Sequence, residues 1–311
     1  MDGKLMRFAA LAASALLWGT AQAQMNTTIV WNAAAPYEGP GDITSFTAWY
    51  GLRGYSQAYA QPGTGVAARV RRASDSTETD IVILPSGDLD QATCTSFCAA
   101  TTCFTRTLYD QTAGNACGGA SCDMVQTNTT LQPQFFCTGG GADTTKPYIQ
   151  SEVSDTMESA NNFSPNAAAE MSGALVGNVT IFTTSAMTLF NSNAASGTTG
   201  WVVAIDSSQR DAWRQNSQYQ TADRAVWHSA NGRAKNGGTN VTTFNVDGSQ
   251  SSGTRTLTVT PGHVRLFGAA TAPTTFHFGE VGFQDNILWD DAMLTALCHN
   301  ERLYWGTPGT C

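Results

Sequence analysis

The chain has 311 residues, a formal net charge of −8 and only 13% charged residues. An acidic chain with scattered basic residues is poorly suited to the phosphate backbone of nucleic acids, so nucleic-acid binding is not expected. The low share of charged residues, with many glycines and small polar residues, is typical of extracellular β proteins and argues against a helical cytosolic enzyme.

The first residues have the pattern of a secretory signal peptide. Lys4 and Arg7 form a short basic start, an apolar run extends from Phe8 to Trp18, and Ala21-Gln22-Ala23 follows. This order predicts a signal peptide over residues 1–23, and a mature protein that is secreted or held at the cell surface. The apolar run has about eleven residues, whereas crossing a bilayer takes about twenty, so membrane insertion is not expected.

Residues 24–311 are interpreted as a single domain, because no linker, low-complexity tract or internal repeat interrupts them. All eight cysteines lie in this part, and an even number behind a signal peptide predicts disulfides rather than a metal site. We expect Cys98–Cys103 to close a tight loop and Cys298–Cys311 to fasten the C-terminal tail. The remaining four cysteines allow three pairings, of which we favour Cys94–Cys137 with Cys117–Cys122.

The N-terminal third combines one aromatic segment with several short strands. Within Ser45–Tyr59, aromatic and apolar residues recur every third position, which predicts a helix. Asp88 is predicted to cap a second helix over about Leu89–Ala99. Alternating residues predict strands at Val66–Arg72, Thr79–Leu84 and Cys103–Tyr109.

Strands dominate from Gly173 onward. The Asp-Gly pair at 247–248 predicts a hairpin turn between strands at 241–246 and 254–259. Asp290 or Asp291 is predicted to cap a final helix through Glu301, with Met293, Leu294, Leu297 and Cys298 on its buried face. Further strands are predicted at 174–183, 186–190, 201–206, 225–228, 263–267 and 274–283. The whole pattern predicts a mainly β fold, an antiparallel two-sheet jelly-roll sandwich with a few peripheral helices.

Several motifs in the first half resemble the catalytic domain of α-L-arabinofuranosidase B. They are an Arg-x-Ser-Asp strand, a Phe-Cys-x-x-Thr-Thr-Cys loop and a Tyr-Asp-Gln-Thr motif, found at 72–75, 97–103 and 109–112. The resemblance is specific over about residues 49–112. The C-terminal part is similar to laminin-G-like and concanavalin-like sandwiches, with a hairpin at 246–248, a strand at 279–283 and a motif at 300–306. The resemblance implies a jelly-roll sandwich and a role connected with polysaccharides.

The same resemblance allows a comparison with the family's catalytic residues. A retaining glycosidase needs two carboxyl groups about 5–5.5 Å apart. The family carries a Glu in a Gly-x-x-Glu-Ala-Ile context, and the best match at 200–205 has Val203 in its place. The family's Asp aligns with Ala269, and its two adjacent cysteines at the sugar site have no counterpart. The resemblance therefore predicts the scaffold without its catalytic pair.

Two other carboxylates remain as alternative catalytic candidates. Asp206 lies in the region that resembles no family, and Glu280 lies on the alternating strand Phe276–Phe283, where a pairing role is the more usual one. Asp110 is interpreted as satisfying loop amides. The four histidines have no zinc spacing, and no Ser-centred elbow is present. No cofactor is expected, although calcium stays open because lectin-like sandwiches often bind it.

Aromatic residues in a Gln- and Asn-rich region suggest binding to sugars. Sugar rings present C–H faces that stack on aromatic side chains, while polar groups bind the hydroxyls. The candidate binding residues are Trp213, Arg214, Tyr219 and Trp227. On alternating strands, however, Trp201 and Trp227 also fit the pattern of core residues. Trp49 and Trp305 are interpreted as structural.

Three functions are compatible with these patterns. The first is a secreted carbohydrate-recognising protein on an arabinofuranosidase-like scaffold, with a polysaccharide or glycan as its partner. The second is a glycoside hydrolase of the α-L-arabinofuranosidase type, acting on arabinose-containing polysaccharide. The third is a structural surface or virion appendage protein that associates with itself. We favour the first.

Overall fold

The computed structural model describes residues 36–311, apart from a set of gaps. Over 187–191, 212–215 and 218–221 it describes the backbone but not the side chains. The chain divides into two units, Met1–Pro36 and Tyr37–Cys311, and every described strand and helix belongs to the second. The predicted signal peptide thus lies outside the described residues. The gaps are 113, 115, 153, 165–169, 182–186, 192–201, 206–211, 216–217, 222–225, 236–241, 254–260 and 268–274.

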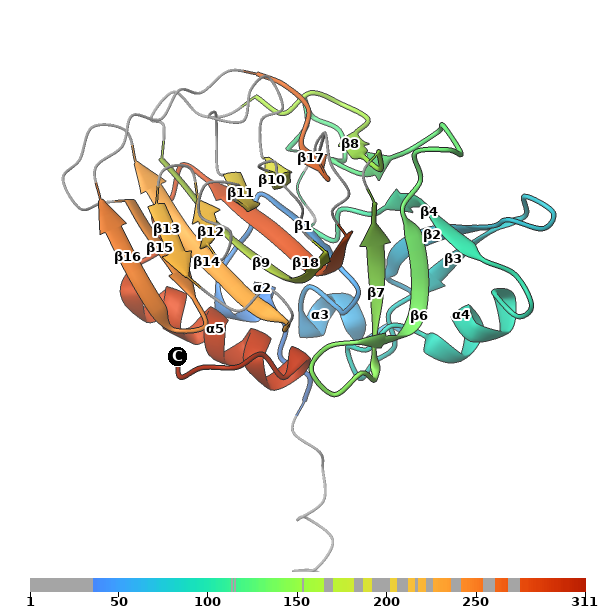
Figure 1. The fold of residues 1–311 in the computed structure, drawn as a ribbon, viewed down its shortest axis with the longest axis horizontal. Coiled ribbons are helices and arrows are strands. Elements are labelled where there is room, and N and C mark those ends of the chain that lie inside the picture. The colour runs from blue at the N-terminus through green and yellow to red at the C-terminus, as the bar shows by residue number, and fades with distance from the viewer. Residues whose placement is uncertain are drawn as a thin grey trace, which may run out of the picture. The chain divides into compact units, whose positions relative to one another are not determined.

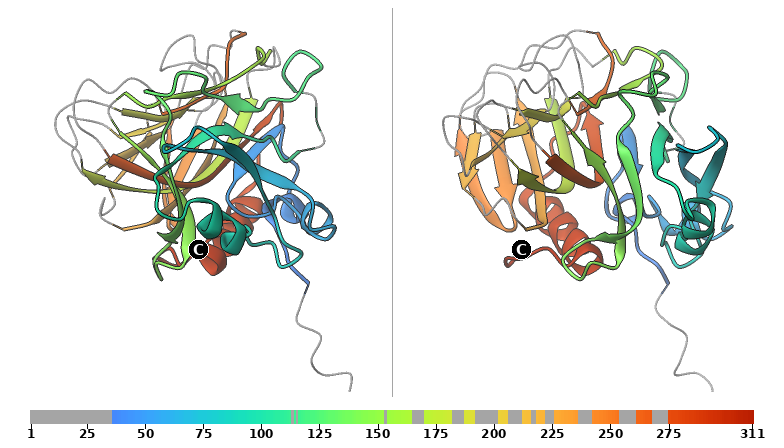
Figure 2. Two further views of the ribbon diagram at one scale, coloured as in Figure 1. Left: turned by 90° about the vertical axis from the view of Figure 1, so that its right-hand side faces the viewer. Right: turned by 45° about the vertical axis from the view of Figure 1, so that its right-hand side comes forward.

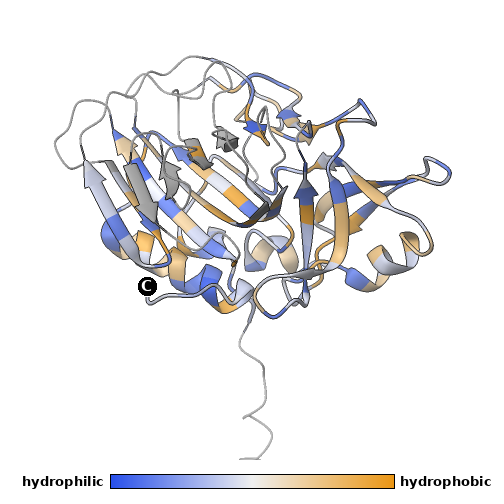
Figure 3. Ribbon diagram, viewed as in Figure 1, coloured by the Kyte–Doolittle hydropathy of each residue, from blue (hydrophilic) through white to orange (hydrophobic). Residues whose placement is uncertain are grey.

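A large antiparallel sheet forms the centre of the fold (Figure 1). Its two longest strands, β9 and β18, pair along most of their length, with Val281 opposite Leu175. Across this sheet the order is β16 (Ser249–Gly253), β15 (Thr242–Val246), β14 (His228–Lys235), β9 (Glu170–Ile181), β18 (Thr275–Asp285) and β1 (Ala48–Gly51). Figure 3 shows hydrophobic and hydrophilic residues alternating along many strands, as expected where each face meets a different environment.

A second row of strands packs against the inner face of this sheet. Phe267 illustrates the packing, because its ring lies edge-on to Phe276 and Phe278 at 5.9 and 6.0 Å. The row consists of β13 (Gln218–Thr221), β12 (Ala212–Gln215), β11 (Val202–Ile205), β10 (Met187–Asn191), β17 (Arg265–Leu266), β8 (Met157–Ser159) and β5 (Met124–Val125). The predicted mainly β sandwich is confirmed.

Five N-terminal strands extend the sandwich on one side. They pair with one another, and the last of them, β7, pairs with the first residues of β18, so the five strands continue the first sheet. They are β2 (Val66–Arg72), β3 (Glu78–Val82), β4 (Cys103–Leu108), β6 (Gln134–Gly140) and β7 (Lys146–Ser151). The sequence predicted β2, β3 and β4 to within about two residues, but it predicted no strand for β5 to β8.

Helix α5 (Asp291–Trp305) lies on the outer face of the first sheet, against β14 and β9 (Figure 2). Asp290 caps it as predicted, since its carboxylate accepts the amide N–H of Met293 at 2.8 Å. Leu294, Leu297 and Cys298 are buried, but the prediction for Met293 is wrong because its side chain is 37% exposed. Among the described residues, no helix has the length and apolarity needed to cross a membrane.

Two predictions for the N-terminal third are wrong in detail. The expected helix over Ser45–Tyr59 is instead β1 followed by the single turn α3 (Gln57–Ala60). Gly51 and Gly54 weaken a helix here, and β1 gains ladder hydrogen bonds with β18. Helix α4 (Gln91–Phe97) is capped by Asp90, not Asp88. A further helical turn, α2, covers Pro40–Ile43.

The predicted hairpin exists with a different second strand. Asp247 and Gly248 both have positive φ angles, of 50° and 87°, which suits a two-residue turn that matches the twist of the strands. β16 therefore begins at once, at Ser249, whereas the predicted strand at 254–259 lies outside the described residues. β14 runs from His228 to Lys235 and shares only His228 with the predicted strand at 225–228, so that prediction is misplaced. Small residues such as Ala230 and Gly232 gave the buried strand no apolar pattern in the sequence.

All eight cysteines form disulfides. The pairs are Cys94–Cys137, Cys98–Cys103, Cys117–Cys122 and Cys298–Cys311, the same pairs that the sequence favoured. The sulfurs of Cys94, Cys98 and Cys137 lie close together, but each is already bound to another sulfur, so this cluster is not a metal site. Such a framework fits an extracellular protein.

Candidate functional site

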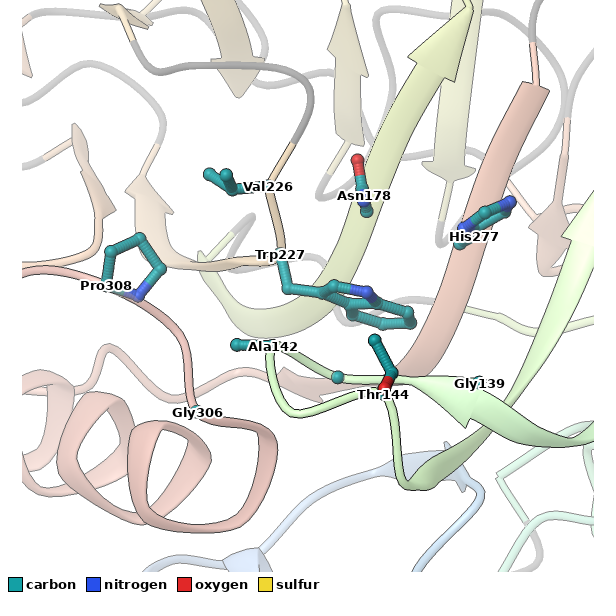
Figure 4. Close-up of a pocket in the computed structure, with 10 residues that line it drawn as sticks. Gly139, Ala142, Thr144, Asn178, Val226, Trp227, His277, Gly306 and Pro308 are labelled. Atoms are coloured by element: carbon teal, nitrogen blue, oxygen red, sulfur yellow. The ribbon is translucent and has the colours of Figure 1, made fainter.

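A pocket of about 410 Å³ opens on the outer face of the first sheet, beside the C-terminal end of α5 (Figure 4). Its back wall consists of Trp227, directly before β14, and of Asn178 and His277 on the neighbouring strands β9 and β18. The register pairs His277 with Asn178 and His228 with Gly177, so these three side chains form a row across the sheet. The end of β6 with the loop before β7, the residue before Trp227, and the C-terminal end of α5 with its tail complete the pocket. They contribute Gly139, Gly141, Ala142, Thr144, Val226, Gly306 and Pro308.

Stacked aromatic rings hold this wall in place. The indole of Trp227 lies parallel to that of Trp305, with ring centroids 5.4 Å apart and planes 7° apart. His277 lies 4.5 Å from Tyr148, which stacks in turn on Phe136 at 4.4 Å. Because each ring is fixed by its neighbour, the wall is preorganised and loses little entropy when a ligand binds.

Gly279 makes this packing possible. A Cβ atom at this position would lie 2.8 Å from the indole of Trp305, closer than real side chains approach. Trp305 can therefore lie directly on the backbone of β18. This brings the end of α5 down to the sheet, and its C-terminal cap Gly306 enters the pocket wall in the left-handed conformation that glycine favours.

His277 contributes a neutral hydrogen-bonding group. Its Nε2 lies 3.2 Å from the amide oxygen of Gln150, and this oxygen can only accept, so Nε2 donates and Nδ1 remains an acceptor. Burial lowers the pKa of His277 to about 4, so the imidazole is uncharged at neutral pH. The described residues that line this pocket therefore carry no charged side chain at neutral pH.

A separate charged cluster lies under α5. Arg53 donates two hydrogen bonds to Glu280, at 2.6 and 2.7 Å, and both side chains are buried. Glu301 accepts a hydrogen bond from the hydroxyl of Ser229 beside this pair. Glu280 is thus fully buried in a bidentate ion pair. The pairing role that its strand position favoured is the one observed.

Other residues singled out from the sequence lie elsewhere. Val203, aligned with the family's glutamate, is fully buried on β11 within the apolar core. Asp206, Ala269 and Trp201 lie outside the described residues. Asp110 accepts hydrogen bonds from the amides of Trp49 and Thr112, which is the structural role expected of it. Burial raises the pKa of its carboxyl to about 6.

The four predicted binding residues do not share one sheet. Trp213 and Arg214 lie on β12, and Tyr219, opposite Arg214, lies on β13; the side chains of these three are not described. Trp227 precedes β14 in the first sheet, and it is the member that lines the pocket. It is only 5% exposed, so it combines the packing role of a core residue with a place in the pocket wall.

The sequence reasoning missed three polar members of the pocket. His277 was one of four histidines without zinc spacing, and neither Asn178 nor Thr144 was predicted to bind a sugar. One signal for His277 was present, because it alternates with Phe276 and Phe278 and must point to the opposite face of the strand from them. Thr144 lies between residues 112 and 173, where the sequence predicted no elements.

Comparison with known proteins supports the resemblance. A family model described as "Alpha-L-arabinofuranosidase B, catalytic" matches residues 41–129. The probable alpha-L-arabinofuranosidase B of Aspergillus flavus is 40% identical over 86 residues, which are 27% of this chain and 17% of that protein. Both matches fall in the N-terminal region where the motifs were found. The resemblance of this region to the arabinofuranosidase B catalytic domain is confirmed.

Solved structures extend the likeness to most of the fold. A glutamate-to-glutamine mutant of a GH54 α-L-arabinofuranosidase, soaked with 4-nitrophenyl α-L-arabinofuranoside, has a TM-score of 0.65 at 16% identity. An arabinofuranosidase complexed with arabinofuranosyl-α-1,2-xylobiose has a TM-score of 0.64 at 15% identity. Each match covers 84% of this chain and 64% of the solved chain. The chain thus spans less than two thirds of these structures, and at this identity the likeness shows the fold.

Proposed function

We propose that this chain is a secreted carbohydrate-recognising protein that uses an arabinofuranosidase-like scaffold to bind a glycan without cleaving it. The observation that carries the proposal is the pocket beside α5, where a fixed indole lies next to neutral hydrogen-bonding groups. This is the composition that a sugar ring requires, since its C–H face packs on an aromatic ring while its hydroxyls need donors and acceptors.

The size and polarity of the pocket support this assignment. Its volume, about 410 Å³, falls within the roughly 300–1,000 Å³ typical of small-molecule sites. Asn178 offers both an amide donor and an amide oxygen, His277 offers a ring nitrogen as acceptor, and Thr144 offers a hydroxyl. This lining suits an uncharged sugar ring. A charged sugar would need a side chain of opposite charge, and the described lining residues include none.

Two observations favour binding over hydrolysis. A buried valine, Val203, stands where the family pattern has a glutamate, and an aliphatic side chain can act neither as a nucleophile nor as an acid. Glu280 is held in its ion pair with Arg53. Hydrolysis of an arabinose-containing polysaccharide remains the alternative, supported by the family resemblance and tested in the same experiment.

The test measures binding and hydrolysis side by side. The mature protein is titrated with arabinan and arabinoxylan by calorimetry, while released arabinose is assayed over a day. We expect saturable binding without release, and at least tenfold weaker binding in Asn178→Ala, because a buried hydrogen-bonding group is lost. Asn128→Ala serves as the matched control, since Asn128 is exposed, lies outside the pocket, and accepts hydrogen bonds from its neighbour Thr130.

Each other result has a definite meaning. Release of arabinose at a steady rate would replace the proposal with the hydrolase alternative. If both asparagine variants lose the same amount of glycan affinity, or if Asn178→Ala loses none, sugars bind outside this pocket. Absence of any binding, with a large assembly by light scattering, would favour the self-associating structural protein.

A further inference from the structure

A second pocket, of about 660 Å³, adjoins the first along the C-terminal tail. The two pockets share Gly306 and Pro308 in their linings. The outer wall of the second pocket comes from α5, through His299, Arg302 and Leu303. These positions are three and four residues apart, so their side chains lie on one face of the helix.

Arg302 differs from the other arginines in the described part of the chain. Six of them pair with a carboxylate: Arg53, Arg69, Arg72, Arg106, Arg233 and Arg265. Arg71 donates to the side chain of Gln132. The side chain of Arg302 makes no ion pair or hydrogen bond with a described residue, although the chain carries a net charge of −8 and thus an excess of carboxylates.

Leu303, next to Arg302, is 87% exposed and is the most exposed large apolar side chain in the described residues. Exposing an isolated leucine has no benefit for folding. Together with Pro308 it gives the second pocket an apolar surface beside a cationic one. This pairing suits a sugar that presents both a C–H face and a negative charge.

We propose that the two pockets form one bipartite site for an acidic oligosaccharide. A neutral sugar occupies the pocket of Trp227, and the adjoining sugar lies across Pro308 with its anionic group at Arg302. The anion is a carboxylate or a sulfate ester, both of which a guanidinium binds through two parallel hydrogen bonds. This inference rests on the proposed function and adds the class of glycan.

The position of Arg302 in the last turn of α5 has a second physical consequence. A cation there stabilises the partial negative charge at the helix end. That effect accounts for a positive residue near Trp305, but it accounts neither for the pocket nor for the exposure of Leu303. The two roles predict different results when Arg302 is replaced. If its role is only structural, the substitution changes the stability of the protein and leaves glycan binding unchanged.

The experiment compares matched glycans. Glucuronoarabinoxylan is titrated before and after chemical reduction of its carboxyl groups to alcohols, and a sulfated galactan before and after desulfation. We expect the wild-type protein to bind at least one acidic form about tenfold more tightly than its neutral counterpart. The pair that shows the difference identifies the anion as a carboxylate or a sulfate.

Variants separate this inference from the proposed function. Arg302→Gln is expected to remove the preference for the acidic form while binding of the neutral form stays unchanged. Arg72→Gln, which removes a half-buried positive charge paired with Asp75 and distant in sequence from both pockets, is the control and is expected to leave the preference for the acidic form unchanged. If Arg302→Gln leaves the preference unchanged, or no acidic form is preferred, the inference is overturned while binding through Asn178 still stands. If no glycan binds at all, both the proposed function and this inference are overturned.

Discussion

The carboxyl group of Glu301 on α5 accepts a hydrogen bond from the hydroxyl of Ser229 on β14, where both side chains are fully buried. Burial, followed by the nearby Glu280, raises the pKa of Glu301 to about 8, although Ser229 and Arg53 act to lower it. The ordinary value for this carboxyl is 4.5. The folded protein therefore keeps a proton on Glu301 at neutral pH that the unfolded chain has lost.

This difference predicts how stability depends on pH. Below about pH 4.5 both states hold the proton, and above it only the folded state does, so the stability contribution of Glu301 is lost as pH rises towards about 8. The loss is on the order of a few kcal/mol. Urea denaturation at pH 5, 7 and 9 measures it. Glu301→Gln, which mimics the protonated form, should flatten this dependence, and an unchanged slope in the variant would contradict the assignment.

The ion pair between Arg53 and Glu280 predicts a strong effect on folding. Glu280→Gln leaves the Arg53 guanidinium buried without a counter-charge, so we expect the free energy of unfolding to fall by about 3–5 kcal/mol. A double variant with both residues replaced by methionine should lose less stability than Glu280→Gln, because no uncompensated charge remains buried. Chemical denaturation of the three proteins gives the comparison. Wild-type stability in Glu280→Gln would show that the pair is not formed.

His277 predicts a glycan affinity that is flat over the ordinary pH range. Burial lowers its pKa to about 4, so its ring stays neutral and Nδ1 stays an acceptor from about pH 5.5 to pH 8. Below pH 5 the ring begins to take up a proton, the acceptor is lost, and binding weakens. Because the unfolded chain takes up this proton near pH 6.5, stability also falls as pH drops from there towards 4. Calorimetry between pH 4 and 8 tests the affinity, and a transition near pH 6.5 would contradict the burial of His277.

The disulfide between Cys298 and Cys311 predicts a link between the tail and binding. The tail between them lines both pockets through Gly306 and Pro308, and the bond closes it over 13 residues. Replacing both cysteines by alanine should cost roughly 3 kcal/mol in stability and weaken glycan binding several-fold. The matched control replaces Cys98 and Cys103, whose bond closes a loop that lines neither pocket. If both double variants bind equally well, the tail does not shape the site.

Local patterns were sufficient for much of the fold. Strands β2 and β4 follow from alternation, the cap at Asp290 from the helix preference for an acidic N-cap, and the turn at Asp247 and Gly248 from their tolerance of positive φ. The helix expected over Ser45–Tyr59 failed because the aromatic spacing there reflects packing against Trp289 and the sheet rather than a helical face. In such a segment tertiary contacts outweigh local preference.

The sequence alone determined the class of the fold and the resemblance to arabinofuranosidase B, because each depends on local patterns or on recognisable motifs. For Cys94, Cys117, Cys122 and Cys137 it left three pairings open, and the structure decided among them. Only the tertiary structure decided the site. Trp227, Asn178 and His277 are separated by 49 to 99 positions, and they become neighbours because β14, β9 and β18 pair in one register. The ion pair of Arg53 with Glu280 spans 227 positions. Contacts of this kind arise from strand pairing and helix docking, which no local pattern encodes.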